Sequence, residues 1–168
     1  MKETITITQA SFSGTYKLEW NDSTDFSKIS PIRQVYGILF NEKGEMVIVR
    51  KKGGGWTLPG GGPEKDETPE ETLIREVNEE VDVDITNITP LGYQKVVEIK
   101  GKTRSKPYYA LRYAAKIEKI KPQTPDPAHK VILERKFIRT KDFIKYCSWG
   151  KIAQHVINKA VAWKKERL

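Results

Sequence analysis

Cysteine is nearly absent from this chain, and its scarcity indicates the kind of cellular compartment in which the protein works. Cys147 is the single cysteine among 168 residues, so no disulfide forms within the chain. Disulfides accumulate in oxidising compartments, so we expect a reducing one, the cytoplasm. Long apolar runs are missing as well. None approaches the roughly 18 residues that span a bilayer, and no membrane association is predicted.

The marks of disordered or fibrous proteins are also missing. Hydrophobic residues make up 38% of the chain and charged residues 31%, with only 12 glycines and 9 prolines. This balance excludes collagen-like and low-complexity proteins, and the length allows a core without disulfides. Residues 1–8 alternate polar and apolar side chains, which predicts a strand and not a signal peptide.

Acidic residues are outnumbered, 22 against 30 basic ones, which gives a net charge of +8. Such a surplus favours anionic partners, either polyphosphates or nucleic acid. Because the basic residues are scattered along the chain, a nucleic-acid partner is not the favoured interpretation. Arg50, Lys51 and Lys52 directly precede a glycine-rich loop. We expect Arg50 and Lys52 to contact a substrate phosphate.

Hydrophobic periodicity predicts a mixed α/β fold of the α+β type. Alternating patterns predict strands, at 3–9, 15–20, 32–40, 45–50, 91–100, 107–117 and 131–138. The turn Asn41-Glu42-Lys43-Gly44 predicts a hairpin between the third and fourth of these. Helical spacing of apolar residues predicts helices at 68–81 and 149–163.

We expect a single domain over 1–168, without a boundary or repeat. Its parts are an N-terminal strand extension (1–30), a core (31–145) and a C-terminal amphipathic helix (146–168). The strands of the extension have three open roles: completing the sheet, exchanging into a partner or covering a substrate pocket. A monomer and a homodimer are both compatible with the sequence.

The helix at 68–81 has a well-marked beginning. Thr68 is a suitable N-cap, Pro69 fits the first helical position, and Glu71 completes a Thr-x-x-Glu capping box. The glycine-rich loop at 53–63 lies just before it.

Three carboxylates gather on one face of this helix. Glu76, Glu79 and Glu80 fall within an arc of roughly 100° at about 100° per residue. They repel one another and lie near the helix C-terminus, where negative charge is unfavourable. A divalent cation would reverse both penalties, and the glycine loop allows close approach of a phosphate. These residues predict a Mg²⁺-assisted phosphate site, the alternative being a solvated acidic face.

The same segment resembles the Nudix box, Gly-x5-Glu-x7-Arg-Glu-U-x-Glu-Glu-x-Gly-U, where U is aliphatic. Eight of its nine specified positions match, namely Gly61, Glu67, Arg75, Glu76, Val77, Glu79, Glu80 and Val83. Asp82 stands where the family has glycine. The resemblance covers roughly residues 32–140 and implies an α/β/α sandwich with a mixed β-sheet.

The resemblance implies a pyrophosphohydrolase that uses Mg²⁺, or Mn²⁺, and splits a nucleoside diphosphate linked to another moiety X. It implies Glu79 and Glu80 as main metal ligands, with the Gly60 carbonyl as a further ligand. Glu76 would ligate metal or orient the attacking water. Arg75 would hold the carboxylates through a bidentate pair.

Two parts of the resemblance are incomplete. Asp82 replaces a glycine that ends the helix, and we expect it to adopt the left-handed conformation at a cost near 1 kcal/mol. The downstream auxiliary acid of the family is not at its usual place. Asp126, His129 and Glu134 are the alternatives for it.

Two other functions stay open beside the hydrolase of a small nucleotide. One is a nucleotide-binding or regulatory module that kept the fold and lost turnover. The other is a hydrolase of RNA 5′ ends, suggested by the net charge. Cys147 is expected to pack in the core and His155 to lie at the surface. Tyrosines at 36, 93, 108 and 109 are interpreted as core or cross-strand residues instead of base-stacking ones.

Overall fold

A computed structural model describes residues 1–9, 12–147 and 149–167. Its strands are β1 (Lys2–Gln9), β2 (Phe12–Asn21), β3 (Ile32–Phe40), β4 (Met46–Arg50), β5 (Gly60–Gly61), β6 (Val83–Lys100), β7 (Thr103–Arg104), β8 (Tyr108–Ile120) and β9 (Glu134–Ile138). Its helices are α1 (Pro69–Val81), the 3₁₀ turn η1 (Thr140–Asp142), α2 (Phe143–Tyr146) and α3 (Gly150–Arg167). No helix in these described ranges is long and apolar enough to cross a membrane.

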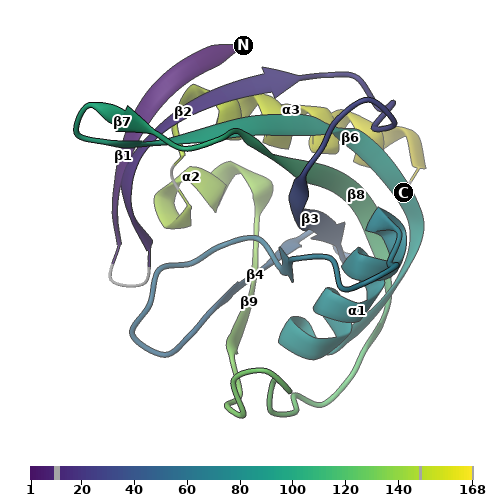
Figure 1. The fold of residues 1–168 in the computed structure, drawn as a ribbon. Helices are drawn as coiled ribbons and strands as arrows, with labels where there is room; N and C mark the ends of the chain where they lie inside the picture. Colours follow the sequence, from purple (N-terminus) through teal and green to yellow (C-terminus); the bar gives the residue numbers. More distant parts are fainter. Residues whose placement is uncertain (10–11, 148, 168) are drawn as a thin grey trace.

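The strands form one mixed sheet, as predicted. Their order is β1-β2-β6-β8-β3-β4-β9, while β5 pairs with β3 and β7 with β6. The β3–β8 pair is parallel and the other ladders are antiparallel. Helix α1 lies on one side of this curved sheet and α3 on the other (Figure 1). The expected α/β/α sandwich is therefore present.

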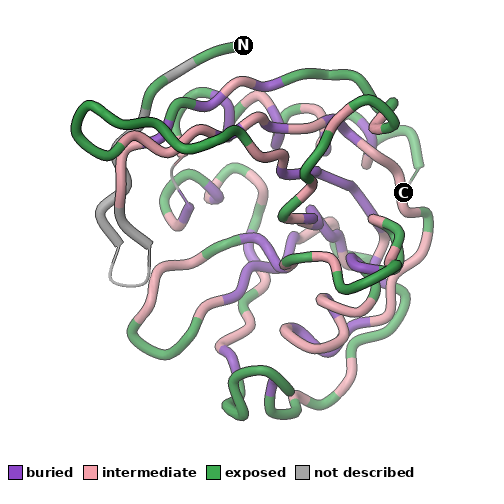
Figure 2. The backbone as a smooth tube through the Cα atoms, in the orientation of Figure 1, coloured by how far each residue is buried: buried purple, intermediate pink, exposed green. Residues whose placement is uncertain are grey.

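Strand β3 contributes to a core on each face because successive side chains of a strand point in opposite directions. Val35 and Leu39 pack with Leu73 and Val77 on the α1 side. Tyr36, Ile38 and Phe40 belong to the core on the α3 side, which α3 closes with Ile152, Val156, Ala160 and Trp163. Figure 2 shows the buried backbone concentrated in these central elements.

The N-terminal strands extend the sheet beyond β6. In β2, Tyr16, Leu18 and Trp20 are buried in the core on the α3 side. Trp20 Nε1 donates to Asp22, which also accepts a hydrogen bond from Lys159 of α3 at 2.7 Å. Of the three roles open from the sequence, the structure shows these strands completing the sheet.

Helix α1 begins as the sequence predicts. Thr68 accepts from the Glu71 N–H, and the Glu71 side chain accepts from the Thr68 N–H, so both halves of the capping box are formed. At the other end Asp82 is left-handed, with φ 48° and ψ 52°. Asp82 therefore adopts the left-handed conformation expected for the residue that replaces the glycine of the motif.

The predicted hairpin between 32–40 and 45–50 is formed but short, because β3 and β4 pair antiparallel only at Phe40–Met46 and β4 pairs mainly with β9. Two strand boundaries differ from the prediction. Strand β6 begins at Val83, eight residues early, in a segment whose register shifts and positive φ at Asn87 hide the alternation. Strand β9 begins only at 134, and the apolar Val131 is exposed in the preceding loop.

Candidate functional site

The C-terminal half of α1 meets the glycine loop at β5. The Gly60 N–H donates to Glu80 Oε2 at 2.8 Å. A Cβ at Gly60, where φ is 139°, would collide with the Val35 carbonyl oxygen, and one at Gly61 would collide with the Glu76 carboxylate. Glycine is required here because backbone and carboxylates approach so closely.

Arg75 holds three carboxylates of the motif together. It forms a bidentate pair with Glu67 at 2.7 and 3.0 Å, and Nη1 donates to Glu76 at 2.9 Å and to Glu79 at 3.3 Å. Nη2 also donates to the Gly62 carbonyl at 2.9 Å. The bidentate pair predicted for Arg75 is made with Glu67, another residue of the motif.

Electrostatics divides these carboxylates into two kinds. The Arg75 hydrogen bonds and the Glu64 N–H lower the pKa of Glu67 to about 2. Burial raises the pKa of Glu76 despite its bond to Arg75. Burial, with the nearby Glu76 carboxylate, also raises the pKa of Glu80 to about 8, against the Gly60 hydrogen bond. Among the described residues, no side-chain cation pairs with Glu80, which is held by the Gly60 N–H alone.

Asp82 links the end of α1 to the loop before β9. Its carboxylate accepts from the Thr124 N–H at 2.9 Å and from the Thr124 hydroxyl at 2.7 Å. Arg135 Nη1 donates to the Val81 carbonyl at 2.6 Å and so caps the helix. These bonds hold the loop that carries Asp126 against the end of α1.

Of the three alternatives for the downstream acid, Asp126 is the one whose carboxylate interacts with the cluster. It is 4% exposed, and its carboxylate contributes to the raised pKa of both Glu76 and Glu80. The other two alternatives lie elsewhere. His129 is exposed and meets Asp126 only through its backbone N–H. Glu134 is paired with Arg50 at 2.7 Å.

The two expected phosphate-binding cations are not joined to the carboxylates. The Arg50 guanidinium stacks on Trp56 at 4.5 Å and pairs with Glu134, and Lys52 is exposed in the glycine-rich loop. No described contact links either of them to α1. Their role toward a phosphate stays a prediction.

The donor set suits a hard divalent cation, because carboxylate and carbonyl oxygens are its preferred ligands. Within the described residues, no three His, Cys, Asp or Glu side chains already converge as metal ligands. Arg75 holds Glu76 and Glu79, and the Gly60 N–H holds Glu80. Binding a cation therefore requires these carboxylates to turn from their present partners.

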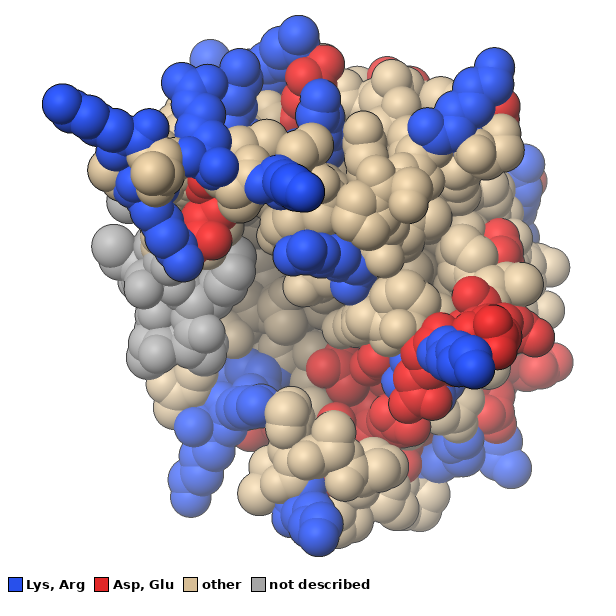
Figure 3. Space-filling view, in the orientation of Figure 1, with Lys and Arg blue, Asp and Glu red and all other residues tan. Residues whose placement is uncertain are grey.

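Beside the acidic cluster the surface is hollowed. Figure 3 shows acidic side chains gathered over α1 and basic ones over the β2–β7 side, with the hollow between them. Tyr36 lies next to the acids, since it pairs with Gly60 and since Glu80 and Glu76 add to the burial that raises its pKa to about 12. Across β3, Tyr36 pairs with Arg112 of β8, which the sequence analysis did not single out.

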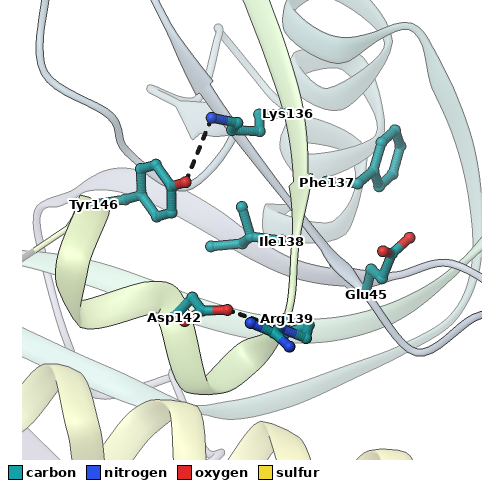
Figure 4. A pocket seen from close by; sticks show the side chains of 7 residues that line it. All are labelled: Glu45, Lys136, Phe137, Ile138, Arg139, Asp142 and Tyr146. Atoms are coloured by element: carbon teal, nitrogen blue, oxygen red, sulfur yellow. Dashed lines mark hydrogen bonds and ion pairs between the residues drawn. The ribbon is translucent and has the colours of Figure 1, made fainter.

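A second cavity, of about 250 Å³, lies between β9 and α2. Figure 4 shows Lys136 directed toward the Tyr146 hydroxyl and Asp142 paired with Arg139. Its cations are paired, exposed or stacked on rings, and none of its lining residues comes from α1. It is separate from the carboxylate site.

A family model described as NUDIX domain matches residues 31–156. The chain belongs to the NUDIX family. This membership agrees with the sandwich fold and with the position of the Nudix box on α1.

Curated relatives match over the segment around the Nudix box. An RNA pyrophosphohydrolase of Marinomonas sp. (strain MWYL1) is 46% identical over 68 residues, which is 40% of this chain and 37% of the relative. An 8-oxo-dGTP diphosphatase of Proteus vulgaris is 51% identical over 60 residues, 33% of this chain and 54% of the relative. The chain thus spans only 37% and 54% of the length of these two curated relatives.

Solved structures match over most of the chain. The Bacillus subtilis pyrophosphohydrolase BsRppH gives a TM-score of 0.66 at 21% identity, covering 90% of this chain and 92% of that one. The C. elegans Ap4A hydrolase gives 0.58 at 17% identity, covering 81% and 99%. At these identities the likeness establishes the fold alone.

Proposed function

We propose that this protein is a divalent-metal-dependent pyrophosphohydrolase that splits a nucleoside diphosphate linked to another moiety X. The observation that carries the proposal is the gathering of Glu76, Glu79 and Glu80 of α1 at the glycine pair of β5, with Asp126 beside them. Family membership and relatives named for anhydride hydrolysis support it.

Glu76, Glu79, Glu80 and the Gly60 carbonyl would hold Mg²⁺ or Mn²⁺. Bound there, the cation would supply charge neutralisation for the phosphates and would lower the pKa of a coordinated water. Arg75 positions Glu76 and Glu79 through the contacts described above. Because Gly61 has no Cβ, the Glu76 carboxylate lies directly against the backbone of β5.

Hydrolysis forms one bond from a water oxygen to phosphorus and breaks the bridging phosphorus–oxygen bond. The products are a nucleoside monophosphate and a phosphorylated X. The water must lose a proton, and Glu76 or Asp126 would accept it, since both are carboxylates withdrawn from solvent beside the scissile position.

The test is incubation of the protein with a panel of nucleoside polyphosphates, with Mg²⁺, with Mn²⁺ or with EDTA, followed by mass spectrometry of the products. We expect cleavage of at least one class with either metal and none in EDTA. The double variant Glu79→Gln/Glu80→Gln should lose that cleavage. Failure to cleave any member in either metal would favour a nucleotide-binding module that lacks turnover.

A second candidate is hydrolysis of the 5′ end of RNA. Exposed cations gather over β2 and the β6–β7 turn (Figure 3), namely Lys17, Lys100, Lys102, Arg104 and Lys106. Such a surface would contact phosphates beyond the first nucleotide. Binding of 5′-triphosphorylated RNA that weakens steeply with salt would support this candidate, and a flat salt dependence would argue against it.

A further inference from the structure

Arg112 of β8 is a buried cation that no carboxylate balances within the described part of the chain. It is 6% exposed. Nη1 donates to the Leu111 carbonyl at 3.0 Å and Nη2 to Gln94 Oε1 at 3.1 Å, while Nε has no partner among the described residues. Burial lowers the pKa of this guanidinium to about 10. Arginine carries five N–H donors, so much of its capacity is unused.

Two aromatic rings cover the guanidinium. Its carbon lies 4.6 Å from the centre of the Tyr36 ring and 5.1 Å from that of Trp149. Cation–π attraction offsets part of the desolvation of the charge. It does not satisfy the Nε–H, which has no hydrogen-bond acceptor among the described residues. A buried N–H without an acceptor is costly, so this edge is suited to a ligand.

The Nε edge of Arg112 lies within about the length of one nucleotide of the proposed reaction centre. Gly60 pairs with Tyr36 on one side of β3, and Arg112 pairs with Tyr36 on the other. Two strand spacings amount to about 10 Å. Tyr36 and Trp149 are only half-buried, so the two rings that cover the guanidinium are in part exposed to solvent. Turning one of these rings would open the Nε edge to a ligand whose phosphates lie at α1.

The chemistry of that edge favours one kind of base. A 6-oxopurine presents O6 and N7, two acceptors that match the side-by-side donors of an arginine. Adenine presents an amino group at the same place, where it would oppose an N–H donor. Gln94 is 3% exposed and accepts from Nη2, so it fixes the orientation of the guanidinium.

We infer that Arg112 is the specificity-determining residue that selects a 6-oxopurine nucleotide, and this inference rests on the proposed function of the neighbouring carboxylates. Tyr36 and Trp149 then act as positioning residues that hold the guanidinium. The substrate class becomes a 6-oxopurine nucleoside diphosphate derivative.

Binding of nucleoside monophosphates tests the inference apart from turnover, since they contain no anhydride to split. Calorimetry with inosine and adenosine 5′-monophosphates compares ligands that differ at the 6-position. We expect the wild-type protein to prefer the inosine nucleotide by about tenfold. Arg112→Met should abolish the preference. Arg112→Lys, which keeps the charge between the rings but not the fork, should abolish it too.

Arg33→Met is the matched control. It removes an exposed guanidinium that lies 5.4 Å from the Tyr108 ring, and it should leave the preference unchanged. Equal binding of both nucleotides by the wild-type protein would overturn the inference. So would an equal loss for both nucleotides and for ribose 5-phosphate in Arg112→Met, which would mark Arg112 as a phosphate contact. Hydrolysis by a protein that shows no preference would support the proposed function and overturn the inference about Arg112. A preference for inosine 5′-monophosphate without hydrolysis would support the role of Arg112 and argue against the proposed function.

Discussion

Arg75 and Arg112 are both largely withdrawn from water, and their surroundings are opposite. Arg75 contacts Glu67, Glu76 and Glu79, so its charge is exceeded by that of its partners. Its pKa is raised, chiefly by the Glu67 hydrogen bonds. Arg112 contacts a backbone carbonyl, an amide and two rings, and its pKa is lowered by burial.

The difference separates two tasks. On the α1 side negative charge is in surplus, which suits a cation and, through it, a polyphosphate. On the α3 side of β3 an uncompensated cation lies among aromatic rings, which suits a base with acceptors. The two proposals would place the reaction at α1 and β5 and base recognition at β8, with β3 between them.

Removing the surplus charge should give the largest effect. Glu79→Gln/Glu80→Gln should lower hydrolysis more than about 100-fold, beyond the cost of losing a contact that only supports a metal ligand. Steady-state turnover at saturating Mg²⁺ measures it. Glu118→Gln removes an exposed carboxylate of β8 and should leave turnover unchanged. Turnover within a few-fold of wild type in the double variant would remove α1 from the reaction.

Removing the balancing cation should have the next largest effect. Arg75→Met leaves Glu67, Glu76 and Glu79 to repel one another, and turnover should fall about 10- to 100-fold, as for other groups that orient metal ligands. Arg75→Lys keeps the charge but loses the bidentate fork, and should recover only part of the activity. Full recovery with lysine would show that charge alone matters at this position.

The approach of the glycine loop to β3 is tested by stability. Gly60→Ala should destabilise the fold by at least about 3 kcal/mol, because the added methyl group meets the Val35 carbonyl oxygen. Gly53→Ala is the control, since φ is 77° there and nothing lies within 4 Å of the added carbon. It should cost about 1 kcal/mol, the backbone penalty alone. If urea denaturation showed equal losses of unfolding free energy in Gly60→Ala and Gly53→Ala, that result would contradict a close approach at Gly60.

A smaller effect is expected on the α3 side of the sheet, where a buried thiol should make the free energy of unfolding depend on pH. Burial raises the pKa of the Cys147 thiol to about 12, against about 8.5 in an unfolded chain. The unfolded state therefore loses its proton first, so this stabilisation is complete below about pH 8.5 and is lost as pH rises toward the folded pKa. The stability difference between wild type and Cys147→Ala should shrink by about 2 kcal/mol between pH 7 and pH 10.

Iodoacetamide gives an independent measurement of the same burial. Native Cys147 should alkylate slowly at pH 8, and urea-unfolded protein quickly. Fast alkylation of the native protein would contradict the packing described for this thiol.

The sequence allowed prediction of those parts of the site that rest on local chemistry. The capping box at Thr68 and Glu71 and the left-handed Asp82 depend on nearby residues, and both are formed. The position of Arg75 among the carboxylates follows from the Nudix box. Strand pairing depends on distant partners, so the early start of β6 and the β4–β9 ladder were not predicted.

Long-range contacts explain the remaining differences. Asp126 joins the cluster because Asp82 binds Thr124, a link 42 residues long that no spacing rule displays. Arg112 lies in an apolar-rich strand, where a single arginine gives no signal until its neighbours are known. The carboxylates of α1 were predicted from the sequence, whereas the surroundings of Arg112 needed the fold.

The most direct test of the account is titration of the protein with Mn²⁺, followed by electron paramagnetic resonance of the free ion. The wild-type protein and Arg112→Met should both deplete free Mn²⁺, and Glu79→Gln/Glu80→Gln should not. Depletion by the double variant equal to that of wild type would contradict a cation site on α1 and, with it, the division between reaction and recognition proposed for this sheet.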